Sequence, residues 1–214
     1  MKRVLVGIPV LYNGAVCLQA FKSVIDEADL LIVDNGAEAD VKEAINQIHV
    51  YNNGCIRVGL IRNAKNEYVT HAWNQILGAF LDENCPYEQL VIMNSDLIMQ
   101  PGWSKYLEDN VWCIVNGGHY SVDTEVFEGI AGVFINFNKA MARLVYPLPE
   151  KLKIWFGDTY IEKKFKNAGY KMIVKAGLKA NHVHGGSVTV RHLPEFQEVI
   201  QQDMIEWETI KHTI

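Results

Sequence analysis

The chain has 214 residues, 49% of them hydrophobic and 21% charged, and its formal net charge is −5 at pH 7. This length is enough to bury the core of one domain. The acidic balance excludes a global field that would attract nucleic acid or acidic membranes. No apolar run reaches the roughly 20 residues of a membrane span, and the N-terminal sequence lacks the cleavage site of a signal peptide. We therefore expect a soluble, cytoplasmic protein without a transmembrane segment.

Up to Leu90, apolar runs of strand length alternate with stretches of helical periodicity. Strands are expected at Arg3–Ile8, Leu30–Val33, Ile56–Ile61 and from Leu90, and helices at Ala15–Ile25, Val41–Ile48 and Glu67–Leu81. Asn13 and Asn66 are the expected caps of the first and third helices. This alternation predicts an α/β fold, with a mostly parallel sheet flanked by helices.

The second half of the chain is less regular. Strands are expected at Trp112–Val115, Ile130–Phe137 and Lys171–Lys175, helices at Lys139–Val145, Asp158–Ala168 and Glu195–Ile210, and a loop at Asn181–Thr189. The sequence holds no internal repeat and no Pro/Gly-rich linker. We therefore predict one domain over residues 1–190 and a C-terminal helical extension over residues 191–214.

The four cysteines are widely spaced. Cys17, Cys55, Cys85 and Cys113 form no C-x-x-C pair. This spacing indicates neither a zinc site nor a disulfide framework, so buried free thiols are expected.

A polar triplet follows the apolar run that starts at Leu90. The run ends abruptly in Asn94, Ser95 and Asp96. In open α/β sheets, ligands bind beyond the carboxyl ends of the strands, so Asp96 is placed to offer a hard oxygen ligand to Mg²⁺ or Mn²⁺. Taken alone, the triplet is more typical of an ordinary turn.

Two earlier strands also end in polar residues. Asp34 ends the second strand, where a carboxylate accepts hydrogen bonds from a ribose or base, although Asp-Asn-Gly is also a common turn. Arg62 ends the third strand, just before a helix N-terminus of the kind that attracts anions. The chain has no glycine-rich phosphate loop, which disfavours a Rossmann dehydrogenase and a P-loop enzyme.

Three later residues offer acid–base or metal chemistry. Asp158 follows an aromatic pair and a glycine at a helix start, where apolar surroundings raise the proton affinity as a general base requires, although local sequence alone favours an N-cap role. His182 and His184 point the same way if their segment is extended. Either imidazole completes a metal shell begun by Asp96, and a purely structural role is the alternative.

Taken in order, these segments resemble the inverting glycosyltransferases of family 2, whose nucleotide-sugar-binding fold is called GT-A. VLVGIPVLYNG is similar to the family's first strand and its proline-containing loop, here with Pro9, and LLIVDNGA to the second strand, whose last Asp is Asp34. RNAKNEYVTHAWN resembles the stretch with two asparagines eight residues apart, Asn66 and Asn74, although Tyr68 replaces the usual glycine.

Two further segments extend the resemblance to residues 2–189. VIMNSDLIMQPGW is similar to the strand with the Asp-x-Asp or Asn-x-Asp metal motif, and WFGDTYIEKKFKNAGYKMIV to the segment in which Glu-Asp precedes a helix. On this match Asp158 takes the place of the base. Gly157 stands where the family has Glu, and Tyr160 where it has a second Asp.

The resemblance implies a metal-dependent transferase that moves a sugar, with inversion, from a nucleotide-diphosphate donor to an acceptor hydroxyl. It assigns the metal, Mn²⁺ or Mg²⁺, to Asp96 together with His184 or His182. It assigns the donor, with a UDP-sugar expected first, to contacts with Pro9, Asp34, Arg62, Asn66, Asn94 and Asp96. The acceptor stays open between a glycan, a carrier-linked sugar and a modified nucleic-acid base.

Two other functions stay open at this stage. The departures at Gly157 and Tyr160 suit a sugar-nucleotide-binding module or an inactive relative. A nucleotidyltransferase also needs a metal and a nucleotide, but it is expected to carry a Gly-rich basic loop after the first strand, where this chain has only VLYNG.

Overall fold

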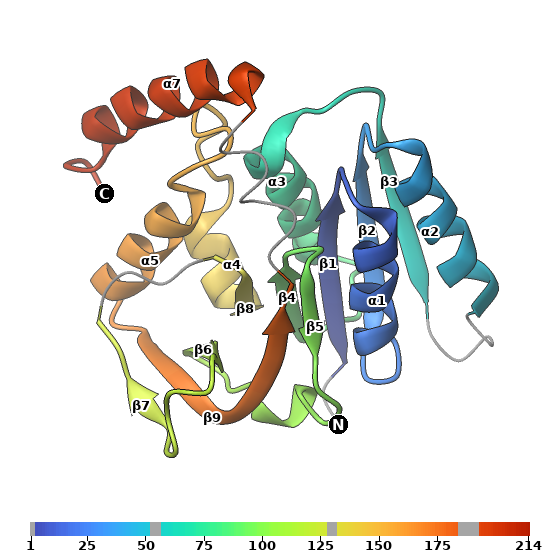
Figure 1. Cartoon of the computed structure of the whole chain (residues 1–214). Coiled ribbons are helices and arrows are strands. Elements are labelled where there is room, and N and C mark those ends of the chain that lie inside the picture. Colours follow the sequence, from blue (N-terminus) through green and yellow to red (C-terminus); the bar gives the residue numbers. More distant parts are fainter. Residues whose placement is uncertain (1–2, 52–56, 128–131, 184–192) are drawn as a thin grey trace.

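The computed structural model describes residues 3–51, 57–127, 132–183 and 193–214 (Figure 1). The first half alternates strands and helices: β1 (Val4–Val10), α1 (Gly14–Val24), β2 (Asp29–Asn35), α2 (Ala39–Tyr51), β3 (Val58–Asn63), α3 (Tyr68–Leu81) and β4 (Gln89–Met93). The second half adds β5 (Leu97–Met99), η1 (Ser104–Tyr106), β6 (Val111–Asn116), β7 (Thr124–Glu125), β8 (Phe134–Asn138), α4 (Lys139–Val145), α5 (Gly157–Asn167), β9 (Lys171–His182) and α7 (Pro194–Ile210).

The main sheet has five strands in the order β3-β2-β1-β4-β8. β3, β2, β1 and β4 run parallel, and β8 pairs antiparallel with β4. The predicted mixed α/β fold with a mostly parallel sheet flanked by helices is thereby confirmed. Because parallel strands end at the same edge, the register places Val10 opposite Asp34 and Asp34 opposite Arg62.

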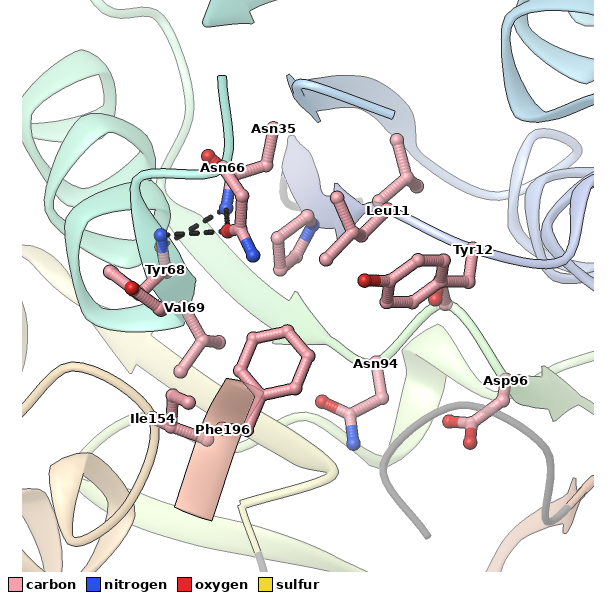
Figure 2. Close-up of a pocket in the computed structure, with 13 residues that line it drawn as sticks. Leu11, Tyr12, Asn35, Asn66, Tyr68, Val69, Asn94, Asp96, Ile154 and Phe196 are labelled. Carbon is pink, nitrogen blue, oxygen red and sulfur yellow. Dashed lines mark hydrogen bonds between the residues drawn. The ribbon is translucent and has the colours of Figure 1, made fainter. Parts of the chain in front are cut away.

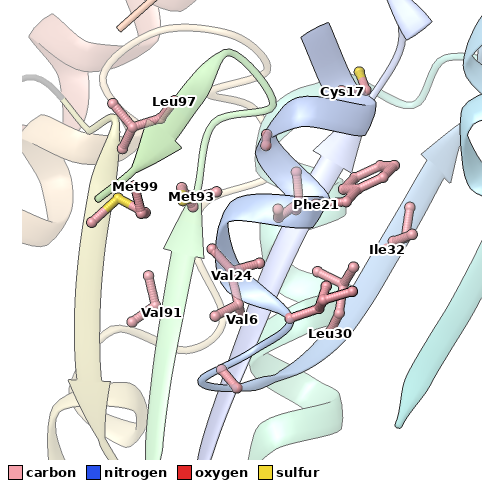
Figure 3. Close-up of a cluster of buried hydrophobic side chains, with 14 of the residues drawn as sticks. Val6, Cys17, Phe21, Val24, Leu30, Ile32, Val91, Met93, Leu97 and Met99 are labelled. Carbon is pink, nitrogen blue, oxygen red and sulfur yellow. The ribbon is translucent and has the colours of Figure 1, made fainter. Parts of the chain in front are cut away.

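Helices cover both faces of this sheet (Figure 1). Val6 and Ile32 pack with Phe21 of α1 in a core that also includes residues of α2 (Figure 3). Their strand neighbours Leu5 and Leu31 point to the other face, into a core with residues of α3, α4 and α5. Successive strand residues face opposite sides, so both must be apolar when both faces are covered. This explains the unbroken apolar runs in the sequence.

A second sheet, in the order β5-β9-β6 with β7 also on β9, was not predicted. The strand expected at Lys171–Lys175 continues to His182, so Asn181 and His182 belong to β9 and not to a loop. Its second half, residues 177–182, mixes small, apolar and polar residues without alternation, and the short β5 pairs with its last three residues, so the local sequence shows no strand pattern.

Helix starts differ from the prediction at two positions. Asn13 caps α1 as expected, because its side chain accepts a hydrogen bond from the Val16 N–H at 3.3 Å. The N-cap of α3 is Glu67, not Asn66. The N-cap of α5 is Phe156, so Asp158 lies in the first turn and is not the cap.

The structure describes three of the four cysteines. Cys17, Cys85 and Cys113 are free; Cys17 and Cys113 are buried as expected, whereas Cys85 is half-buried. Cys55 lies outside the described residues. Within the described parts of the chain, none of the helices combines the length and the apolar character needed to cross a membrane.

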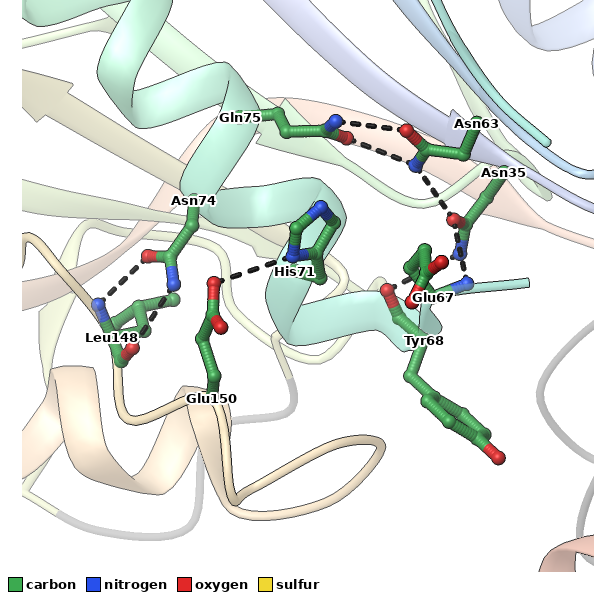
Figure 4. Close-up of polar contacts among 9 residues, drawn as sticks. All are labelled: Asn35, Asn63, Glu67, Tyr68, His71, Asn74, Gln75, Leu148 and Glu150. Carbon is green, nitrogen blue, oxygen red and sulfur yellow. Dashed lines mark hydrogen bonds and ion pairs between the residues drawn. The ribbon is translucent and has the colours of Figure 1, made fainter. Parts of the chain in front are cut away.

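Asn74 ties helix α3 to the connection between α4 and α5 (Figure 4). Its side-chain amide donates to the Leu148 carbonyl at 3.0 Å, and its Oδ1 accepts the Leu148 N–H at 2.8 Å. Asn74 is 8% exposed and Leu148 is 1% exposed, so both hydrogen bonds are shielded from water. Asn74 is therefore a structural residue that fixes the chain leading toward α5.

We predict that Asn74→Ala lowers the free energy of unfolding by at least about 2 kcal/mol, because it leaves two buried backbone groups of Leu148 without partners. Urea denaturation measures this change. The control is Asn46→Ala, at an exposed position of α2, where a change within about 0.5 kcal/mol is expected. Equal losses in the two variants would contradict the structural role.

Candidate functional site

A pocket opens at the edge where the parallel strands end (Figure 2). The residues that line it are Pro9, Val10, Leu11, Tyr12, Asn35, Asn66, Tyr68, Val69, Asn94, Ser95, Asp96, Ile154 and Phe196. The structure thus brings together four predicted site residues, Pro9, Asn66, Asn94 and Asp96, from loops far apart in the sequence. A cavity at the carboxyl ends of parallel strands is the usual ligand site of this architecture.

Asp96 and His182 form a pair at this pocket. His182 Nε2 lies 3.2 Å from Oδ1 of Asp96, and the Asp96 side chain is 6% exposed. The pair forms because β5 and β9 run antiparallel with Leu97 opposite His182, and the Val183 N–H donates to the Asp96 carbonyl at 2.9 Å. His184 lies outside the described residues.

The spacing of this pair suits a divalent ion. Two cis ligands at about 2.1 Å from an octahedral ion lie about 3 Å apart. A carboxylate oxygen and a neutral imidazole are both ligands for Mn²⁺. In the described part of the chain no three His, Cys, Asp or Glu side chains cluster as a metal site. An ion at Asp96 and His182 would thus take further oxygens from water or a substrate phosphate.

Asp34 is buried just behind the pocket wall. One carboxylate oxygen accepts the Ala37 N–H at 2.8 Å, and the other lies 4.0 Å from the Arg62 guanidinium, whose side chain is 56% exposed. Asp34 and Arg62 are not among the described lining residues, and Asn35 takes that place. The Asp34 carboxylate thus stabilises the turn after β2, as the Asp-Asn-Gly sequence predicted, and it also faces the Arg62 guanidinium.

The sequence interpretation missed Asn35. Its amide donates to Asn66 Oδ1 at 3.0 Å (Figure 2). The same amide donates to the Tyr68 carbonyl at 3.2 Å, and the Asn35 Oδ1 accepts from the Asn63 amide at 2.9 Å (Figure 4). Asn63 also exchanges hydrogen bonds with Gln75 of α3. The sequence offered one indication of this network, because Asn35 and Asn63 end adjacent strands. The network fixes the β3–α3 loop against the sheet.

Tyr68 explains one departure from the family pattern. Its backbone is left-handed, with a φ of 67°. Glycine adopts this conformation without penalty, which accounts for a glycine there in the resembling family. Here the tyrosine carries the strain and lines the pocket, while the Lys153 ammonium lies 5.3 Å from its ring centre.

Asp158 is half-buried and held by backbone groups. Its Oδ2 accepts the Gly132 N–H at 3.0 Å, and its Oδ1 accepts the Thr159 N–H at 2.8 Å. A Cβ on Gly132 would lie 2.6 Å from the Asp158 Cβ, so only glycine permits this approach. Asp158 is not one of the described residues that line the pocket at Asp96.

The other two departures from the family pattern are packing features. A Cβ on Gly157 would lie 3.2 Å from the Trp73 ring, so a side chain at this position requires its neighbours to shift by a few tenths of an ångström. Tyr160 is 8% exposed, and burial raises the pKa of its hydroxyl. Both residues are therefore buried packing residues at the start of α5.

The cysteine nearest the pocket is not a nucleophile. Cys17 donates to the Tyr12 carbonyl at 3.4 Å and contacts Ser95, and burial raises the pKa of its thiol to about 11. A thiol with that pKa stays protonated at neutral pH. Cys17 therefore supports the pocket floor from α1.

Comparison with known proteins identifies the fold. No family model matches the chain, and no curated protein matches its sequence. Solved structures do match. The mannosyltransferase PcManGT from Pyrobaculum calidifontis, in complex with GDP-Man and Mn²⁺, is 14% identical with a TM-score of 0.65, over 94% of this chain and 69% of that one. At such low identity the similarity establishes the fold alone.

Two further structures share this fold. S. aureus TarS 1-349, in complex with UDP, is 12% identical with a TM-score of 0.60, over 95% of this chain and 65% of that one. A mycobacterial protein is 15% identical with a TM-score of 0.57, over 95% of this chain and 72% of that one. The chain therefore has a fold also found in proteins crystallised with nucleotides and nucleotide sugars.

We predict that Gly157→Ala lowers the free energy of unfolding by about 1–3 kcal/mol, because the new methyl group overpacks the Trp73 contact. Gly157→Glu, which restores the family residue, is expected to cost more. Thermal and urea unfolding measure both. Gly117→Ala is the control, because its new Cβ would be 3.6 Å from the nearest atom. A Gly157→Glu variant as stable as the parent would show that the Trp73 contact does not exclude a larger side chain at position 157.

Proposed function

We propose that this protein is a metal-dependent, inverting glycosyltransferase that uses a nucleotide-diphosphate sugar. The observation that carries the proposal is the Asp96–His182 pair at the wall of an amide-lined pocket, at the carboxyl edge of the sheet. Support also comes from the shared fold, since one similar structure was solved with GDP-Man and Mn²⁺ and another with UDP.

In this proposal Asp96 and His182 would hold Mn²⁺ or Mg²⁺, and His184, which the sequence favoured over His182, is the other candidate. The ion, when bound, neutralises negative charge that develops on the departing diphosphate. Asn66 and Asn94 offer side-chain amides to the ribose and diphosphate, and Pro9 lies on the same wall. Only two described protein ligands are available, so the ion is held weakly without a donor.

Asp34 and Arg62 complete the proposed donor site. Asp34 is buried at the strand edge beside Asn35, and its second carboxylate oxygen faces the exposed Arg62. A ribose hydroxyl or a base N–H arriving there would find an acceptor in Asp34. A diphosphate or a base carbonyl would find a donor in Arg62.

Asp158 is the proposed general base. Two backbone N–H groups fix its orientation. Oδ1 accepts the Thr159 N–H and also the Thr159 hydroxyl at 3.4 Å, whereas Oδ2 accepts the Gly132 N–H and retains a lone pair for the proton of an acceptor hydroxyl. The hydroxyl oxygen then attacks the anomeric carbon from the face opposite the leaving diphosphate, which inverts the configuration.

We predict that Asp158→Asn and Asp96→Ala impair different steps. Asp158→Asn removes the base and is expected to lower turnover about 10²–10⁴-fold while preserving donor binding. Asp96→Ala removes a metal ligand and is expected to weaken Mn²⁺-dependent binding of the nucleotide diphosphate. Turnover assays and calorimetry with UDP or GDP and Mn²⁺ separate the two effects.

The matched control is Asp26→Asn, an exposed carboxylate that is neither a lining residue of the pocket nor one of the proposed site residues, which should change neither quantity. If Asp158→Asn and Asp96→Ala both leave turnover intact, the assignment is wrong. If they act alike, binding and chemistry are not divided between the two residues as proposed.

A panel of UDP- and GDP-sugars with Mn²⁺ tests the function against its alternatives. We expect slow release of free nucleotide diphosphate, as water replaces the missing acceptor. Exchange that depends on pyrophosphate would instead identify a nucleotidyltransferase. Binding without turnover of any donor would identify a sugar-nucleotide-binding module or an inactive relative.

A further inference from the structure

Helix α7 packs against the segment that leads to Asp158, over the part of the fold that contains α5 (Figure 1). From sequence alone this helix was predicted only as a C-terminal extension. In the structure its first turn brings Phe196 into the pocket wall, and Figure 2 shows the Phe196 ring beside Val69 and Ile154 and across from Tyr12. The helix therefore contributes directly to the cavity around Asp96.

Asp203 of α7 is fully buried, with 0% exposure. Its carboxylate accepts three consecutive backbone N–H groups, from Lys153 at 2.8 Å, Ile154 at 2.7 Å and Trp155 at 2.8 Å. A buried carboxylate that accepts three N–H bonds is a strong and directional anchor, because charged acceptors form stronger hydrogen bonds and cannot be left without donors. Asp203 therefore fixes the conformation of this turn.

Two more side chains of α7 hold the same segment. The Trp207 ring stacks on Phe156 with ring centres 5.4 Å apart and planes 3° apart. Glu206 lies 3.6 Å from the Lys151 ammonium. Phe156 has a left-handed φ of 65° and is the N-cap of α5. A left-handed aromatic residue is strained and persists only when its surroundings enforce it, and the Trp207 stack is one such constraint.

The turn is also tied to the start of α3, next to Val69 of the pocket lining. The Thr70 N–H of α3 donates to the Lys153 carbonyl at 3.2 Å, while Ile154 lines the cavity. Two residues after Phe156 comes Asp158. A shift of the 153–156 turn would thus move the pocket wall and the start of α5 together.

We propose that Asp203 is a positioning residue for Asp158, acting through the 153–156 turn and the Phe156 cap. The inference rests on the proposed function, because it needs Asp158 to act as a base. It makes α7 a part of the active site, although the helix lies outside the segments that resemble the transferase family. Asp203 itself touches no substrate and transfers no proton.

The test measures donor hydrolysis and UDP–Mn²⁺ or GDP–Mn²⁺ binding for Asp203→Asn, which keeps the size of the side chain but removes its charge and one acceptor oxygen. Displacing a catalytic group by about 1 Å costs up to about 10²-fold in rate. We therefore expect kcat to fall about 10–100-fold, with the nucleotide dissociation constant changed less than about threefold. Ile205→Ala, at a residue 70% exposed on the same helix, should change neither.

A double-mutant comparison shows whether Asp203 acts through Asp158. In the Asp158→Asn background, Asp203→Asn should cause little further loss of kcat, because the group being positioned is already disabled. A merely stabilising residue would lower the folded fraction and leave kcat per folded molecule unchanged. If Asp203→Asn does not fold, Trp207→Leu replaces it in both measurements, since it loosens the same segment without burying an uncompensated group.

An unchanged kcat, or an equal fall in both backgrounds, would overturn the positioning role while leaving the proposed function standing. A wild-type protein that turns over no donor, whether or not it binds UDP or GDP with Mn²⁺, would overturn the proposed function and the inference with it. The two failures are thus distinct.

Discussion

The antiparallel pairing of β5 with β9 is the constraint on which the candidate metal site depends. Its register sets Leu97 opposite His182 and so brings the imidazole within 3.2 Å of Asp96. A shift of one residue would turn His182 to the other side of the strand, because side chains alternate along a strand. The triplet after β4 becomes a candidate metal site only through this long-range contact.

The sequence was sufficient to predict the main sheet, because strands covered on both faces must be apolar throughout and the helices between them show clear periodicity. It was not sufficient for the second sheet, because the second half of β9 mixes small, apolar and polar residues and pairs with strands that are distant in sequence. Pro9, Asn94 and Asp96 could be placed together because they end adjacent strands. Asn35 was missed because it looked like part of a turn.

The left-handed backbone of two residues near the pocket could not be predicted from the sequence either. Tyr68 and Phe156 have left-handed φ angles of 67° and 65°, and each lies at the start of a helix beside the site. Strain of this kind persists where hydrogen bonds and packing enforce it, as the Asn35 network does for one and α7 for the other. The residues that shape this pocket therefore lie partly outside the segments with recognisable chemistry.

The location of the metal tests the account most directly. A crystal of the protein soaked with UDP and Mn²⁺, with diffraction recorded at the manganese absorption edge, would give that location without assuming any reaction. The account predicts an anomalous peak about 2.1–2.2 Å from an oxygen of Asp96, with a late histidine and diphosphate oxygens completing the shell. UDP bound in the pocket without manganese at Asp96, or manganese bound elsewhere, would contradict it.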